Sequence, residues 1–225
     1  MQKALQRVFS LFIKTSPPRK GNRHKSRGQS LVEVAISFPI LIILFSGVVE
    51  FGFILNYYLS LLDATRDAAR LYSGGDPFDT KLFRSPYGAD TFYYDTAFEV
   101  KRTLDPSIDD VTYKGRRILF DPTIDDVIVS VYSAEGNQVR ACRSPVDFHL
   151  FPTWGAGGNQ TSMFNTSSIL NARVSGAPDA GLLVVEIHYR YHQVLGLPWM
   201  KPFDPIILRA YSIMPIRAAE PPSCP

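Results

Sequence analysis

"RGQSLVEVAISFPILIILFSGVVEFG", residues 27–52, has the composition of a membrane-spanning helix, yet it holds Glu33 near its start and Glu50 near its end. The 16 residues between these two acids carry no charge. With about 1.5 Å of rise per residue, the helical stretch 31–62 would reach roughly 48 Å, beyond the hydrocarbon core of a bilayer, which is about 30 Å thick. We therefore expect one long helix that spans a membrane and continues outside it.

The outer end of this span is indicated by Asn56, Tyr57 and Tyr58, because their amphipathic side chains are typical of a membrane interface. We place the span at about residues 32–56. Residues 1–28 contain eight basic residues and no acidic one, whereas the rest of the chain has 16 basic and 21 acidic residues. Since Lys and Arg are retained on the cytoplasmic side, this asymmetry predicts a cytoplasmic N-terminus, a single pass and an extracytoplasmic body.

A basic N-terminal segment can also be an arm that binds nucleic acid. Such an arm is usually solvated along its whole length, whereas this one runs directly into an apolar segment. We therefore expect a membrane, and no nucleic acid, as a partner. The body contains Cys142 and Cys224, which in an oxidising compartment would fit one disulfide and would equally fit two buried thiols.

The two glutamates need an explanation, because a charge inside a bilayer costs on the order of 2–3 kcal/mol and usually faces protein or water. Glu33 and Glu50 are 17 residues apart, which puts them about 100° apart around a helix, so one partner is not expected to satisfy both. The alternative is a simple signal anchor whose acids are protonated or reach the interface. A cleaved secretory signal is disfavoured, because the apolar run is too long and no small-x-small site follows it.

The residues around Glu33 resemble the class III signal of type IV pilin-like proteins, with Gly28 five residues before the acid and a basic leader before Gly28. Downstream, "VVEFG" at 48–52 and "LLDATRDAARLYSGG" at 61–75 extend the likeness. As a set, these motifs resemble the TadE-like family of tight-adherence pilus systems over about 29–75, and two later segments resemble the family's closing strands more weakly: "GLLVVEIHYRYHQVLGLPWM" and "IILRAYSIMPIR". Val34 replaces the family's usual aromatic residue, and the leader is long.

This resemblance implies a minor, pseudopilin-like subunit that takes part in biogenesis or assembly of a tight-adherence pilus at the bacterial cytoplasmic membrane. It implies cleavage by a prepilin-type peptidase after Gly28, which would leave a new amine on Gln29. In pilin-like assembly such an amine meets the glutamate of a neighbouring subunit, a role that falls to Glu33 here. By the same logic we expect Glu50 to contact a helix of another pilus component, so the implied partners are other pilus subunits, assembly platform proteins and the peptidase.

Beyond the membrane the sequence predicts an α+β fold, with a small antiparallel sheet that has one face on helices. Asp-Arg pairs and alanines continue the first helix to about residue 72, and Gly74 and Gly75 should end it. Residues from Val185 alternate between apolar and polar, which predicts a strand with an apolar face and a polar face. The other expected elements are a loop at 76–90, a helix at 90–106, a hairpin that turns at 135–137, and a last strand at 206–216.

The predicted organisation has three parts: a basic cytoplasmic leader at 1–28, the transmembrane helix and its extension at 29–75, and the extracytoplasmic head at 76–225. Within the head, a stretch at about 144–180 is rich in Gly, Asn, Ser and Thr. We expect it to be an exposed insertion.

The sequence contains no motif of a known catalytic, cofactor or metal site, so we expect no enzyme activity, no cofactor and no metal. His188 and His192 are four residues apart on a predicted strand, about 13 Å, which is too far for one zinc ion. His149 is expected to be a packing or surface residue. The repeat "DPSIDDV" at 105–111 and "DPTIDDV" at 121–127 fits turn chemistry better than a calcium site.

A second function remains open from the sequence. The chain could be a signal-anchored binding or sensing protein, whose head recognises a ligand and whose helix is a simple tether. The role of Glu33 separates the two interpretations, because a tether has no need of an acid at that position.

Overall fold

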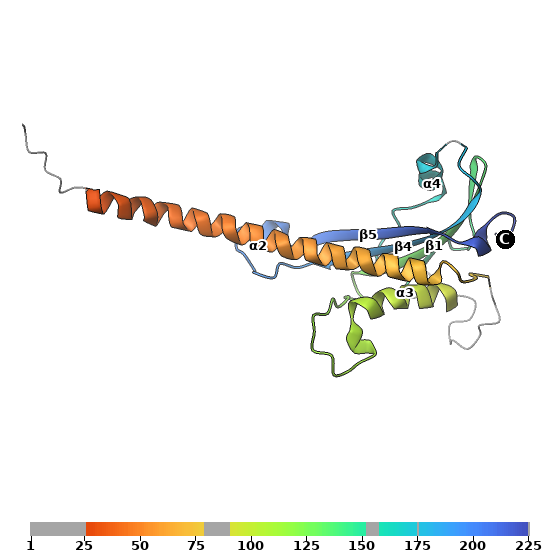
Figure 1. The fold of residues 1–225 in the computed structure, drawn as a ribbon, viewed down its shortest axis with the longest axis horizontal. Helices are drawn as coiled ribbons and strands as arrows, with labels where there is room; N and C mark the ends of the chain where they lie inside the picture. Colours follow the sequence, from red (N-terminus) through yellow and green to blue (C-terminus); the bar gives the residue numbers. More distant parts are fainter. Residues whose placement is uncertain (1–25, 79–90, 152–157, 175, 225) are drawn as a thin grey trace, which may run out of the picture. The chain divides into compact units, whose positions relative to one another are not determined.

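The computed structural model describes residues 26–78, 91–151, 158–174 and 176–224 of the chain. The chain divides between Gly47 and Val48 into two compact units, which are described separately below. The elements are, in chain order (Figure 1), α2 (Ser26–Tyr72), α3 (Thr91–Leu104), η3 (Pro106–Ile108), β1 (Asp126–Glu135), β2 (Gln138–Ala141), β3 (Asp147–His149), α4 (Thr166–Ala172), β4 (Ala180–Tyr191), η4 (Lys201–Phe203), β5 (Ile206–Pro215) and η5 (Arg217–Ala219).

The described part of the N-terminal unit is the first part of helix α2, and its large apolar side chains are exposed. Leu31 and Phe45 are among the most exposed of them. Within the described residues, one helical stretch, Ser30–Tyr72, is long and apolar enough to cross a membrane. Exposed apolar surface of this extent is unfavourable in water, so the helix has the character of a membrane anchor or a signal.

The C-terminal unit is built on a five-stranded antiparallel sheet, as the sequence predicts. The strand order is β2-β1-β4-β5, and β3 pairs with β1 on the same edge as β2. The hairpin from β1 to β2 turns at Gly136, whose φ of 53° suits a glycine. The predicted second helix corresponds to α3. Of the loop predicted at 76–90, residues 79–90 lie outside the described residues.

One face of the sheet packs against α3 and against α2 beyond Val48 (Figure 1). From β4, Val185, Ile187 and Tyr191 point into this core, which confirms the predicted alternation. Helix α2 contributes a stripe of small residues, Ala64, Ala68 and Ala69, together with Leu61. Small side chains let the helix backbone lie close to the sheet, so a long apolar face is buried with little bulk.

Part of the opposite face of the sheet is covered by the stretch at about 144–180, where the sequence predicts an exposed insertion. In the described part of this stretch, β3 joins the sheet and the short helix α4 buries Ile169 against Tyr132 and Val184. Asn165 caps α4 by accepting a hydrogen bond from the N–H of Ser168. Polar composition predicts exposure here, but it does not reveal that part of such a segment packs on a sheet.

The two aspartate repeats form turns, as predicted. The carboxylate of Asp105 accepts a hydrogen bond from the N–H of Ser107, and that of Asp121 accepts one from Thr123. Asp125 caps the second turn by accepting from the N–H of Asp121 at 2.8 Å. The carboxylates of Asp105 and Asp121 thus accept from the N–H two residues further on, which is the usual chemistry of an Asx turn.

Candidate functional site around Glu50

Glu50 is fully buried in the C-terminal unit, although it lies on helix α2 just after the uncharged run. Its carboxylate accepts three hydrogen bonds, from the Tyr191 hydroxyl at 2.5 Å, the Val194 N–H at 2.9 Å and the Leu195 N–H at 3.0 Å. Tyr191 ends strand β4, and the other two residues belong to the segment 192–205 between β4 and β5, called here the β4–β5 loop. The carboxylate therefore joins the helix to this loop.

The β4–β5 loop is shaped by its own contacts so that two consecutive N–H groups point at Glu50. Gly196 has a φ of 59°, which lets the chain turn back directly after Leu195. The Leu197 N–H then donates to the side-chain oxygen of Gln193 at 3.0 Å, and the Leu197 side chain is buried. Asp204 closes the loop, because its carboxylate lies 3.2 Å from the ring nitrogen Nδ1 of His192.

Aromatic side chains pack beside the Tyr191 ring. The Tyr57 ring lies edge-on to Tyr191, with centroids 5.0 Å apart, and stacks on Tyr189 at 6.1 Å. The Arg116 guanidinium lies 4.3 Å above the Tyr57 ring, a favourable cation–π arrangement. Burial raises the pKa of Tyr191, and the neighbouring Glu50 carboxylate raises it further, so the hydroxyl keeps the proton that it donates.

This arrangement positions one part of the chain against another. A carboxylate that accepts three hydrogen bonds has few lone-pair directions left for a substrate or a metal ion, and each bond to a charged acceptor contributes about 1.5–3 kcal/mol. The sequence suggests that Glu50 contacts a helix of another component, because a carboxylate in an apolar helix requires a polar neighbour. The structure provides the partners from within the same chain.

The other predicted assembly residue, Glu33, belongs to the N-terminal unit, whereas Glu50 belongs to the C-terminal unit. Glu33 is exposed on α2. The helix begins at Ser26, so Gly28 and Gln29 lie in its first turns, ahead of the apolar run. Neither Gly47 nor Gly52 has any atom within 4 Å of where a Cβ would stand, so both leave open space beside the helix.

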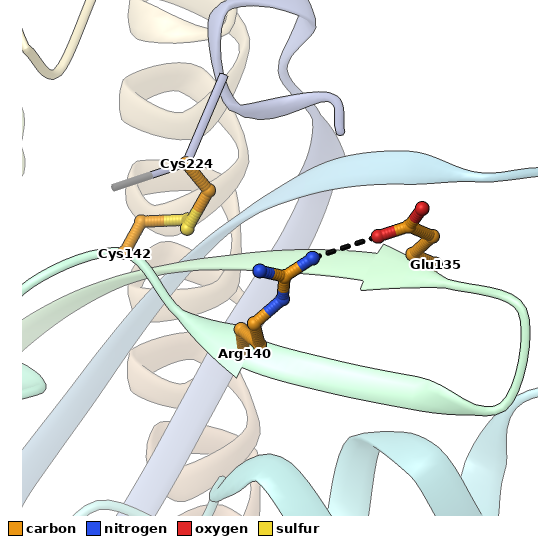
Figure 2. The surroundings of a disulfide bond; sticks show 4 residues. All are labelled: Glu135, Arg140, Cys142 and Cys224. Atoms are coloured by element: carbon orange, nitrogen blue, oxygen red, sulfur yellow. Dashed lines mark hydrogen bonds and ion pairs between the residues drawn. A yellow bond between two sulfur atoms is a disulfide. The ribbon is translucent and has the colours of Figure 1, made fainter. Parts of the chain in front are cut away.

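Cys142 and Cys224 form a disulfide (Figure 2), one of the two states that the sequence left open. Cys142 directly follows β2, and Cys224 is close to the end of the chain. Both residues are buried at the edge of the core that α2 and α3 share with the sheet. On the same hairpin, Arg140 and Glu135 form an exposed ion pair at 2.7 Å (Figure 2). The disulfide fixes the C-terminal segment to the sheet.

Buried acids and histidines gather on the face of the sheet away from α2. The Asp126 carboxylate lies 2.8 Å from Nδ1 of His149, so this histidine has a packing role. Glu186 accepts hydrogen bonds from the Ser162 hydroxyl and from the Met163 N–H. Within the described ranges, no group of three or more His, Cys, Asp or Glu side chains has an arrangement suited to a metal ion.

Sequence reasoning singled out Glu50 but missed Tyr191, Val194 and Leu195. One available signal was the buried stripe of α2, because Glu50 falls in helical register with Tyr57, Leu61, Ala64 and Ala68. An acid within such a stripe faces the same part of the protein against which the stripe packs. Its particular donors could not be found in this way, since Tyr191 lies 141 residues further along the chain.

Comparison with known proteins finds a family match within helix α2. Residues 28–70 match the model of a family described as TadE-like protein. No curated protein and no solved structure matches the chain. The chain therefore carries a TadE-like domain at residues 28–70.

Proposed function

We propose that this chain, given its TadE-like domain, is a minor pilin-like subunit that a prepilin-type peptidase processes between Gly28 and Gln29. The observation that carries the proposal is the position of the domain, which begins at Gly28 and contains Glu33 at the start of an exposed apolar helix. In this proposal α2 is a single-pass anchor in the bacterial cytoplasmic membrane. The partners are other pilus subunits and proteins of the assembly platform.

Cleavage gives Glu33 a physical role. Removal of the leader exposes an α-amine on Gln29, and the amine of one subunit pairs with the exposed Glu33 of a neighbour. A desolvated ion pair adds little net stability, but leaving it half-made is costly. The pair therefore sets the register between helices in the assembly, and Glu33 is an assembly residue rather than a catalytic one.

The disulfide supports an extracytoplasmic head. Disulfides persist in oxidising compartments and are rare in the cytosol, and the Cys142–Cys224 bond lies wholly within the C-terminal unit. The basic leader, with eight positive residues, supports the same orientation because it is retained on the cytoplasmic side.

The processing step is tested by the intact mass of the membrane-bound protein after co-expression with its prepilin-type peptidase. We expect a mature chain that begins at Gln29, and we expect Gly28→Ala to leave the leader attached. Gly52→Ala is the matched control, because it changes a glycine of the same helix that also has open space around it. A chain that still begins at Met1, and that Gly28→Ala does not alter, would reject the processing step.

The assembly role is tested by Glu33→Gln, with surface pili and membrane insertion measured in the same cells. We expect pili to be lost while the protein inserts normally. The control is Asp63→Asn, which removes an exposed carboxylate further along α2. Normal pili with Glu33→Gln would instead favour a tethered binding or sensing protein, in which the helix only anchors the head.

A further inference from the structure

We propose that the β4–β5 loop and the adjoining side of α2 form a lipid-contacting collar, which rests in the interface of the outer membrane leaflet beside Glu50. The collar is defined by six large apolar residues: Phe51, Leu55, Val194, Leu195, Trp199 and Phe203. The inference rests on α2 as the membrane anchor, as proposed above, but it does not depend on cleavage of the leader or on pairing of Glu33.

The collar exposes large apolar side chains. Its six side chains are 42–68% exposed, and four of them lie within the ten residues from Val194 to Phe203. Single exposed apolar side chains are common, whereas a group of them usually marks a surface that contacts another apolar phase. Lipid is one such phase.

The position of the loop along α2 indicates which phase it contacts. Three hydrogen bonds hold the loop at Glu50, immediately after 16 uncharged residues. Between Glu50 and Leu59 no exposed side chain of α2 is charged, and all but one of the exposed side chains there are apolar or aromatic, the exception being Asn56. They become charged from Asp63 onward, at Asp63, Arg66, Asp67 and Arg70. The loop therefore lies at the level of the apolar part of the helix and not of the charged part.

The length of the helix then sets the depth of the collar. Residues 31–49 rise about 28 Å, close to the thickness of about 30 Å of a hydrocarbon core. A membrane span that ends at residue 49 puts Glu50 at the outer boundary of the hydrocarbon core. This boundary lies about six residues before the one near residue 56 that the interfacial tyrosines suggest. Tyr57, which suggested that later boundary, instead packs on Tyr189 and Tyr191.

The chemistry of the loop suits the interface better than the bilayer centre. Its backbone is irregular, and irregular backbone exposed to lipid is not tolerated in the hydrocarbon core. Trp199 and the exposed Lys201 are of the residue types that gather at headgroup level, where anionic lipids also attract a lysine. The one acid of the loop, Asp204, is close to His192.

Trp199 provides the test, because Trp154 is the other tryptophan of the chain and can be replaced by Phe. The full chain with Trp154→Phe is placed in vesicles of phosphatidylcholine and phosphatidylglycerol. We expect blue-shifted emission from Trp199, protection from acrylamide, and strongest quenching by lipids that carry bromine near the headgroups. Emission of a water-exposed tryptophan, without quenching by brominated lipid, would overturn the proposal.

Two further variants make the result specific. In a chain that lacks both native tryptophans, Phe203→Trp should repeat the behaviour of Trp199, whereas Val111→Trp, at a strongly exposed apolar position outside the collar, should remain accessible to acrylamide. Folding of each variant is checked by formation of the disulfide on a non-reducing gel. Protection from acrylamide that grows with protein density, without lipid quenching, would assign the collar to a second protein copy and reject lipid. Pilus and processing assays report separately on the proposed function.

Discussion

The hydroxyl of Tyr191 donates a 2.5 Å hydrogen bond to the carboxylate of Glu50, which lies 141 residues earlier in the chain. Together with two N–H groups of the β4–β5 loop, this bond fastens the end of the longest strand to helix α2. The acid that looks out of place in an apolar sequence is therefore a structural link within the C-terminal unit.

Glu50→Gln should weaken this unit. An amide keeps the shape of the side chain but replaces one acceptor oxygen with an NH₂ group, so it turns a donor toward the N–H of Leu195 or Val194. An unsatisfied buried donor costs about 1–3 kcal/mol, and we expect a loss of that size in the free energy of unfolding. Urea unfolding of the detergent-solubilised protein measures it, with Asp63→Asn as the exposed control. Equal stability of Glu50→Gln and the parent chain would contradict the link.

Tyr191→Phe should produce a smaller loss, because two N–H donors to Glu50 remain. Since Tyr191 and Glu50 are in direct contact, the effects of Tyr191→Phe and Glu50→Gln should not add. The measurement is a double-mutant cycle on the free energy of unfolding. Strict additivity would mean that the two side chains stabilise the fold independently.

Replacement of both Cys142 and Cys224 by serine should destabilise the head. A disulfide that closes a long loop typically contributes about 2–4 kcal/mol, and this one spans 82 residues. The expected result is a lower urea midpoint for the double variant, with no change from reductant. In the parent chain, reductant should lower the midpoint to a similar extent.

The same bond predicts the thiol chemistry of protein taken from cells. Without reductant, a maleimide reagent should add no mass to the denatured chain, because Cys142 and Cys224 are its two cysteines and are joined. After reduction it should add two groups. Two adducts without reductant would indicate free thiols, and would argue against an oxidising location for the head.

Stability should fall in alkaline solution. Burial raises the pKa of Tyr189 to about 12, whereas a tyrosine in the unfolded chain titrates near pH 10. Between these values the unfolded state loses its proton first, so rising pH favours unfolding. Tyr189→Phe should remove part of the decrease in urea midpoint between pH 9 and pH 11, and Tyr211→Phe is the control for loss of a hydroxyl. An unchanged pH dependence would show that Tyr189 does not contribute.

Gly181→Ala should strain the junction between β4 and the C-terminal segment. A Cβ at this position would stand 2.2 Å from the carbonyl oxygen of Ile216 and 2.6 Å from the backbone of Ala219, and neither can move freely. Overpacking of this kind costs about 1–3 kcal/mol. Gly74→Ala is the control, since its Cβ would meet nothing within 4 Å. The urea midpoint distinguishes the two variants.

The sequence by itself determined the features that depend on local pattern. The long apolar helix follows from an uncharged run, and strand β4 follows from its alternation of apolar and polar residues. The TadE-like region could also be recognised from the sequence, because its motifs lie within one continuous stretch. Each of these signals involves residues that are neighbours along the chain.

The tertiary structure decided the features that join distant residues. Nothing in one sequence pairs Glu50 with Tyr191 or chooses a disulfide over two thiols, because these contacts form only when α2, the hairpin and the C-terminal segment pack on one sheet. The burial of Ile169 in α4 has the same origin: the polar composition around it describes the local backbone, whereas this side chain is buried by Tyr132 and Val184 of the sheet.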